Sequence, residues 1–137
     1  MFEHLIAEHI RDPAVVERMT VEQRLVFGLF SLRQEVDSGG FDSYFRYSAG
    51  DTAALAVEGA RLLSPRWSEL IEEACRALGS PYPLDIDTRE QVLDRLEKEQ
   101  PDLLARLDQR KYALEAEERV DDEVDVFIWA HRSSFFA

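Results

Sequence analysis

Hydrophobic residues recur with the spacing of α-helices along nearly the whole chain. Between residues 20 and 36 the apolar positions fall at i, i+4, i+7, i+8, i+11 and i+15, which places them on one face of a helix. Thr20 followed three residues later by Gln23 is a capping-box pattern, and Gly39 with Gly40 is a stop signal. The pattern predicts a helix that begins after Thr20 and ends at the two glycines.

The next two predicted helices lie on either side of a Ser-Pro pair. An alanine-rich helix is expected over residues 51–63, with one side formed by Leu55, Gly59 and Leu62. Glycine costs about 1 kcal/mol of helix propensity relative to alanine, so we expect another helix to approach closely at Gly59. Ser64 and Pro65 are typical of an N-cap and a first-turn proline, and they open a helix that Gly79 ends.

The second half of the chain continues the helical pattern after a proline-containing loop at residues 80–85. Three helices are expected there, over about residues 87–99, 101–119 and 121–131. Asp87 or Thr88 is the expected cap of the first of them. Because no stretch alternates between apolar and polar positions, no strand is predicted. We therefore expect an all-α fold, a single compact domain of residues 1–137 with six or seven helices.

The composition excludes several classes of function. Of the 137 residues, 28 are acidic and 16 are basic, which gives a formal net charge of -12. Such a charge opposes direct binding to nucleic acid or to an anionic membrane, because both require a basic face. The first twelve residues carry no basic residue before Arg11, unlike the start of a signal peptide. No uninterrupted apolar run approaches the ~20 residues that span a bilayer. We expect a cytoplasmic protein.

Residues that could support catalysis or metal binding are few and poorly spaced. His4 and His9 are five residues apart, so they do not share a helix face as zinc ligands at i and i+4 do. Cys75 lies on the apolar stripe of its helix and is expected to be a buried small side chain rather than a nucleophile. We therefore expect a protein that is not an enzyme and that has no cofactor or metal ion.

The placement of the negative charge is more informative than its amount. Residues 85–126 hold 15 acids and 7 bases, and the densest run has seven acids, namely Glu115, Glu117, Glu118, Asp121, Asp122, Glu123 and Asp125. Carboxylates one helical turn apart lie about 6 Å from each other, of the same order as neighbouring phosphates on a strand, so a basic protein could bind them in place of nucleic acid. The alternatives are that these acids complement a helix dipole or keep the surface soluble.

Trp129 follows the acidic run on the side of its helix away from the apolar positions. A half-exposed tryptophan beside carboxylates is a suitable anchor for a partner protein. The alternative is that Phe135 and Phe136 pack over it and leave it no role in binding.

Residues 35–51 form the densest local motif of the chain. Phe41, Tyr44 and Phe45 fall at i, i+3 and i+4 after the two glycines, which favours an aromatic wedge between two helices. The alternative is a small-molecule or catalytic pocket formed by Tyr44, Tyr47 and Asp51.

This motif resembles a bacterial family of domains of unknown function that includes a DNA mimic protein. The matching positions are Glu35, Val36, Gly39, Gly40, Phe41, Tyr44, Phe45, Ser48, Gly50 and Asp51. Ser43 and Tyr47 depart from the Gln and Asn that the family tends to have, and Asp37 with Ser38 replaces its usual Asn. The resemblance implies an all-α fold. It also implies, from the DNA mimic member, an acidic surface that occupies the DNA-binding face of a transcription factor.

Charge and resemblance together favour a non-enzymatic interaction protein. Its acidic run and Trp129 would bind a basic or DNA-binding protein, and the glycine and aromatic motif would be structural. Two rivals stay open at this point: a ligand or catalytic site at Tyr44, Tyr47 and Asp51, and a regulatory or immunity-type partner protein whose acidity is incidental. A homodimer is open as well.

Overall fold

The computed structural model describes residues 17–136, which contain seven α-helices and no strand. The all-α expectation and the number of helices are therefore confirmed. The elements are α2 (Val21–Arg46), the 3-10 helix η2 (Ser48–Thr52), α3 (Ala53–Leu63), α4 (Pro65–Leu78), α5 (Ile86–Glu99), α6 (Leu103–Glu117), α7 (Val120–Ala130) and α8 (Arg132–Phe135). Within residues 17–136 no helix is long and apolar enough to cross a membrane.

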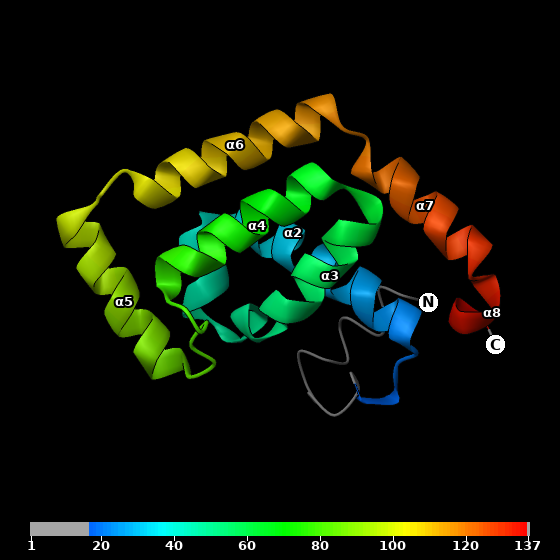
Figure 1. Cartoon of the computed structure of the whole chain (residues 1–137), viewed down its shortest axis with the longest axis horizontal. Helices are drawn as coiled ribbons and strands as arrows, with labels where there is room; N and C mark the ends of the chain where they lie inside the picture. The colour runs from blue at the N-terminus through cyan, green and yellow to red at the C-terminus, as the bar shows by residue number, and fades with distance from the viewer. Residues whose placement is uncertain (1–16, 137) are drawn as a thin grey trace.

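Helices α2, α3 and α4 form the centre of the fold, and α5, α6 and α7 form an arc around them (Figure 1). One cluster of buried residues joins α2, α3, α4, α5, α6 and the first residue of α7. The largest of its side chains is Trp67 of α4, which is fully buried. The arc therefore packs its inner side on the same core as the central helices, while its outer side faces solvent.

Local signals determine where most of the helices begin. The capping box at α2 is present, because the Gln23 N–H donates to the Thr20 hydroxyl at 3.1 Å and the Thr20 N–H donates to Gln23 Oε1 at 2.9 Å. Ser64 caps α4, and Gly79 follows its last residue. These two starts and the Gly79 stop confirm the sequence predictions, whereas α2 does not end at Gly39 and Gly40 but bends there and continues to Arg46.

Two helices of the arc begin at other residues than predicted. Helix α5 begins at Ile86, because Asp85 rather than Asp87 or Thr88 is its N-cap, and the Asp85 carboxylate accepts from the Thr88 N–H at 3.0 Å. Helix α6 begins at Leu103, two residues after Pro101. Both differences are within one helical turn.

Helices α2 and α3 cross at two glycines, Gly28 and Gly59. This confirms the predicted close approach of another helix at Gly59. A Cβ at Gly59 would lie closer than 3.0 Å to the Leu25 carbonyl oxygen, and one at Gly28 would lie 2.6 Å from the Leu55 Cβ. Of the side predicted to be formed by Leu55, Gly59 and Leu62, only Gly59 is buried, and Leu62 is 61% exposed. The buried positions of α3 are instead small, namely Ala53, Ala56, Gly59 and Ala60. Two backbones this close leave room only for small side chains.

Candidate functional site

The two glycines of the motif bend α2 and dock its second half against α6. Gly39 and Gly40 leave the helical conformation, and the φ of Gly40 is +77°, which favours glycine. The Phe41 N–H that follows the bend donates to the Asp108 carboxylate of α6 at 2.8 Å. A Cβ at position 40 would lie 2.5 Å from that carboxylate. Burial raises the pKa of Asp108, and the Phe41 N–H opposes this shift.

The aromatic residues of the motif belong to the core. Phe41, Tyr44 and Phe45 are fully buried, as an aromatic wedge would be. The Tyr44 hydroxyl hydrogen-bonds to Thr52 Oγ1 at 2.9 Å, and Thr52 donates to the Ala49 carbonyl at 2.7 Å. Burial raises the pKa of Tyr44 far above its ordinary value, so the hydroxyl stays protonated and holds α2 to η2.

Arg89 of α5 ties the end of the motif to the rest of the protein. Its fully buried side chain donates from Nε to the Phe45 carbonyl at 2.7 Å and from Nη2 to the Tyr47 carbonyl at 3.1 Å. Nη2 also reaches Asp51 Oδ1 at 2.9 Å. Nη1 donates to two carbonyls of the proline-containing loop, those of Pro83 and Leu84. One guanidinium, with its donors in a fixed fork, thus joins two segments of backbone, the end of α2 and the proline-containing loop, to the Asp51 carboxylate of η2.

Sequence reasoning missed Arg89. Arginine is among the residues least often buried, so its position on a helix carries no sign of burial. The sequence offers only an indirect signal for a buried side-chain donor. The loop at residues 80–85 and the turn at residues 47–52 have few helical hydrogen bonds of their own, so their backbone carbonyls need another donor.

The rival ligand site does not come together as one open pocket. Tyr44 is fully buried with its hydroxyl engaged, whereas 60% of Tyr47 is exposed. The Asp51 carboxylate is paired with Arg89. The three side chains lie in different environments, and these placements support a structural role for the motif.

The fold divides the acidic run into an inner and an outer part. Glu115 faces inward, where its two oxygens accept from Arg33 of α2 at 3.0 Å each. Glu118 accepts from the Ser64 hydroxyl and lies 3.6 Å from Arg66. The Glu115 side chain is 26% exposed and the Glu118 side chain 25%. The inner carboxylates therefore attach the end of α6 to α2 and α4.

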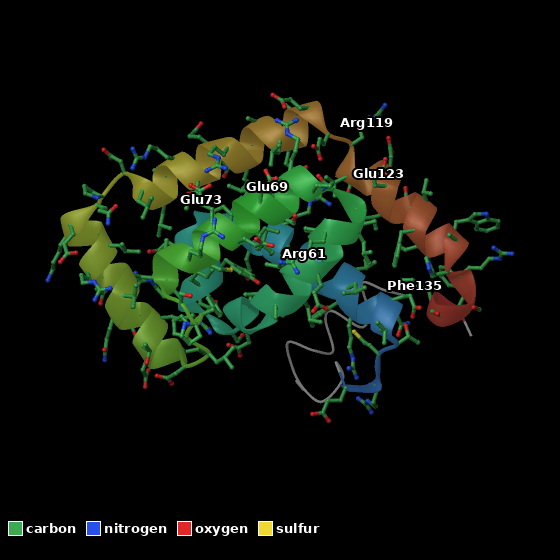
Figure 2. The ribbon with its side chains drawn as sticks, viewed as in Figure 1. Arg61, Glu69, Glu73, Arg119, Glu123 and Phe135 are labelled. Carbon is green, nitrogen blue, oxygen red and sulfur yellow. The ribbon has the colours of Figure 1, made fainter. Side chains whose placement is uncertain are left out.

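The outer part of the run consists of five exposed carboxylates, namely Glu117, Asp121, Asp122, Glu123 and Asp125. Arg66, Arg33 and Arg119 pair with the first three of them, at 2.7, 2.8 and 3.0 Å respectively. Within the described part of the chain no ion pair involves Glu123 or Asp125. Figure 2 shows Arg119 and Glu123 where α6 passes into α7. We call these five residues the outer carboxylates.

Trp129 lies on the outer side of α7, where 69% of it is exposed. The Arg132 guanidinium lies 4.8 Å from its ring centroid. The alternative in which the terminal phenylalanines cover Trp129 is wrong, because Phe135 is buried and packs on Phe127, while Phe136 is itself 60% exposed. Trp129 is thus an exposed aromatic residue on the same helix as four of the outer carboxylates.

The acidic surface does not continue along α6. The exposed charges in the middle of that helix are basic, Arg106 and Arg110, and Arg110 pairs with Glu73 of α4, which is labelled in Figure 2. A second group of exposed acids lies on α5, formed by Asp87, Glu90, Asp94 and Glu97, of which Glu90 and Asp94 pair with Arg46 of α2 at 3.9 and 3.1 Å. The carboxylates therefore form separate groups rather than one ridge.

A groove of about 220 Å³ lies between α2 and α7. Its described lining includes five apolar residues, Val26, Leu29, Phe30, Val124 and Ile128. Its charged lining residues are Arg33, Asp121 and Asp125. Since Arg33 is bonded to Asp121 and Glu115, Asp125 is the lining carboxylate that has no ion pair within residues 17–136.

The Arg33–Asp121 pair should be visible in the titration of Asp121. The hydrogen bond from Arg33, together with its charge, lowers the pKa of the Asp121 carboxyl below the ordinary value. In an Arg33→Gln variant we expect this pKa to rise back towards the ordinary value of an aspartate, as measured by NMR of carbon-13-labelled carboxylates. Arg119→Gln is the matched control, because Arg119 pairs with Asp122 instead. An unchanged Asp121 pKa in Arg33→Gln would contradict the pairing.

The sign of the accompanying stability change follows from the lowered pKa. The folded state holds the Asp121 proton less tightly than the unfolded state, so the pair contributes stability above pH ~4 that is lost as the pH falls through the folded pKa. Because 81% of the Asp121 side chain is exposed, we expect this contribution to be below about 1 kcal/mol.

Cys75 and His131 lack the surroundings of catalytic groups. Burial raises the pKa of the Cys75 thiol to about 12, which disfavours the reactive thiolate. The His131 ring packs on Phe127 and its Nδ1 lies 3.0 Å from the Phe127 carbonyl oxygen. His4 and His9 lie outside the described residues. Among residues 17–136 no three His, Cys, Asp or Glu side chains are arranged to hold a metal ion.

Comparison with known proteins identifies the family of the chain. No curated protein and no solved structure matches the chain. The DMP19-like protein family matches residues 17–131, a range that includes the bent α2, Arg89 and all the outer carboxylates. It is the family with a DNA mimic member that the glycine and aromatic motif resembles. The chain belongs to the DMP19-like protein family.

Proposed function

We propose that this protein is a non-enzymatic interaction protein that binds a basic, DNA-binding protein in place of nucleic acid. The observation that carries the proposal is the group of outer carboxylates, five exposed acids within residues 117–125. Membership of a DNA-mimic family supports the same function.

The spacing of the outer carboxylates suits a partner that normally binds phosphates. Asp121 and Asp125 are one turn apart on α7, so their carboxylates are about 6 Å apart along the helix axis. Residues 115–125 carry seven acids and one arginine, a net charge of -6. A field of this sign attracts a basic surface over about one Debye length, roughly 8 Å at physiological ionic strength.

The inner carboxylates support the proposal by fixing where the outer ones lie. Glu115 and Glu118 join the end of α6 to α2 and α4 before any partner arrives. A surface that is already ordered loses less conformational entropy on binding. The raised pKa of Cys75 and the engaged hydroxyl of Tyr44 favour binding over catalysis.

The proposal is tested by capture of partners from the lysate of the source cell at low salt and at about 0.5 M salt. We expect a basic DNA-binding protein to bind at low salt, to be released at high salt, and to be displaced by DNA in a mobility-shift competition. Recovery of no basic or DNA-binding protein at low salt would refute the function. A partner that binds DNA and this protein at the same time would refute the mimicry.

A charge-matched pair of variants then locates the surface. The first removes four outer carboxylates by Glu117→Gln, Asp122→Asn, Glu123→Gln and Asp125→Asn. The second removes four exposed acids of α5 and the following turn by Asp87→Asn, Glu97→Gln, Glu99→Gln and Asp102→Asn. We expect the first variant to weaken binding to the captured partner at least tenfold, about 1.4 kcal/mol, and the second to weaken it less than about threefold. Equal losses would show that net charge alone matters.

A further inference from the structure

We propose that the groove between α2 and α7 binds a single arginine or lysine side chain of the basic partner. This inference rests on the proposed function, because it assigns one specific contact to the surface that the outer carboxylates form. The groove combines an apolar lining with a carboxylate rim, which is the chemistry of a long cationic side chain.

The apolar lining fits the stem of such a side chain. Lysine and arginine carry three or four methylene groups that favour apolar surroundings while the charged head stays at the water boundary. Val26 and Leu29 are each 1% exposed and belong to the packed part of α2, so one wall of the groove is fixed by the core. Val124 and Ile128, one turn apart on α7, form the facing wall.

The charged residues of the groove fit the head group. Arg33 would repel a second cation if it were alone, but it is bonded to Glu115 and Asp121. With Asp125 included, this set has one positive and three negative charges, a sum of -2. Asp125 keeps both oxygens available within the described part of the chain, and a guanidinium would bind it through two parallel N–H···O bonds.

The neighbouring acid Glu123 provides a control that distinguishes binding in the groove from general attraction between opposite charges. Glu123 and Asp125 are both exposed, both on α7, and neither has an ion pair among residues 17–136. Only Asp125 lines the groove. Removing either residue changes the net charge equally, so a difference between the two variants reports the groove itself.

The experiment is an NMR titration of the full-length, nitrogen-15-labelled protein with N-acetyl-arginine amide, with N-acetyl-lysine amide as the second cation and N-acetyl-glutamine amide as the neutral control. We expect saturable shifts at Val26, Val124 and Ile128 with a dissociation constant on the order of 1–10 mM for the cations, and none for the glutamine compound. Asp125→Asn should weaken binding of the arginine compound by a factor of about five or more, whereas Glu123→Gln should weaken it less than about twofold. Equal effects of the two variants, or shifts that do not saturate, would overturn the inference.

The same variants distinguish failure of the inference from failure of the proposed function. If a basic partner is captured and Asp125→Asn binds it no worse than Glu123→Gln, the groove inference is wrong while the function stands. If no partner is captured but the arginine compound saturates the groove and requires Asp125, the groove binds cationic side chains and the proposed function is wrong.

Discussion

Replacing Arg89 with methionine is expected to lower the free energy of unfolding by about 4 kcal/mol. Methionine retains the apolar stem but removes every donor, so the Phe45, Tyr47, Pro83 and Leu84 carbonyls lose their bond to the guanidinium. The bond to the Phe45 carbonyl is buried, and a buried carbonyl left without a donor costs about 1–3 kcal/mol, to which the lost pairing with Asp51 adds. Urea unfolding followed by circular dichroism measures the change.

Arg95→Met is the matched control for Arg89→Met, because Arg95 is exposed on the same helix. It should change stability by less than about 0.5 kcal/mol. Arg89→Lys should be intermediate, since an ammonium keeps the charge but cannot reach the end of α2, the proline-containing loop and Asp51 at once. If Arg89→Met is as stable as the natural protein, Arg89 does not tie α2 to the proline-containing loop.

Gly59→Ala is expected to destabilise the protein by about 2 kcal/mol although alanine is the better helix former. Propensity alone predicts a gain of about 1 kcal/mol in α3. The added methyl group would meet the Leu25 carbonyl oxygen of α2 at less than 3.0 Å, and backbone cannot rotate away as a side chain can. The two helices must separate, which opens packing along their whole crossing.

The neighbouring substitution Glu58→Ala isolates the contribution of propensity. Glu58 is exposed on α3, so this change adds an alanine without adding a contact. It should leave the urea midpoint nearly unchanged, whereas Gly59→Ala lowers it by about 1 M. A Gly59→Ala protein more stable than the natural one would show that α2 and α3 are not in close contact there.

The parts of the fold that depend on short-range chemistry could be predicted from the sequence. The capping box at Thr20, the Ser64–Pro65 start of α4 and its Gly79 stop involve residues within one turn of each other. The start of α5 was misassigned because three cap-forming residues, Asp85, Asp87 and Thr88, follow one another closely. Pattern alone cannot choose among them.

Features set by tertiary contact were harder to predict. The sequence places Leu55, Gly59 and Leu62 on one side of α3, but it does not indicate that α2 approaches at Gly28 and Gly59 and leaves room only for small buried residues. The acidic run was recognised from its charge, but its division was not. Arg33 is 82 residues from Glu115 in the sequence, and nothing local indicates that the two meet.

The division of the acidic run also bears on how members of this family can diverge. The carboxylates that hold helices together face Arg33 and Ser64, and their loss would disturb the scaffold. Glu123 and Asp125 make no ion pair within residues 17–136, so substitutions there should change the free energy of unfolding little. Selection can therefore alter the surface that we propose for partner binding while the architecture stays constant. A fold shared within the family therefore does not by itself determine which partner a member binds.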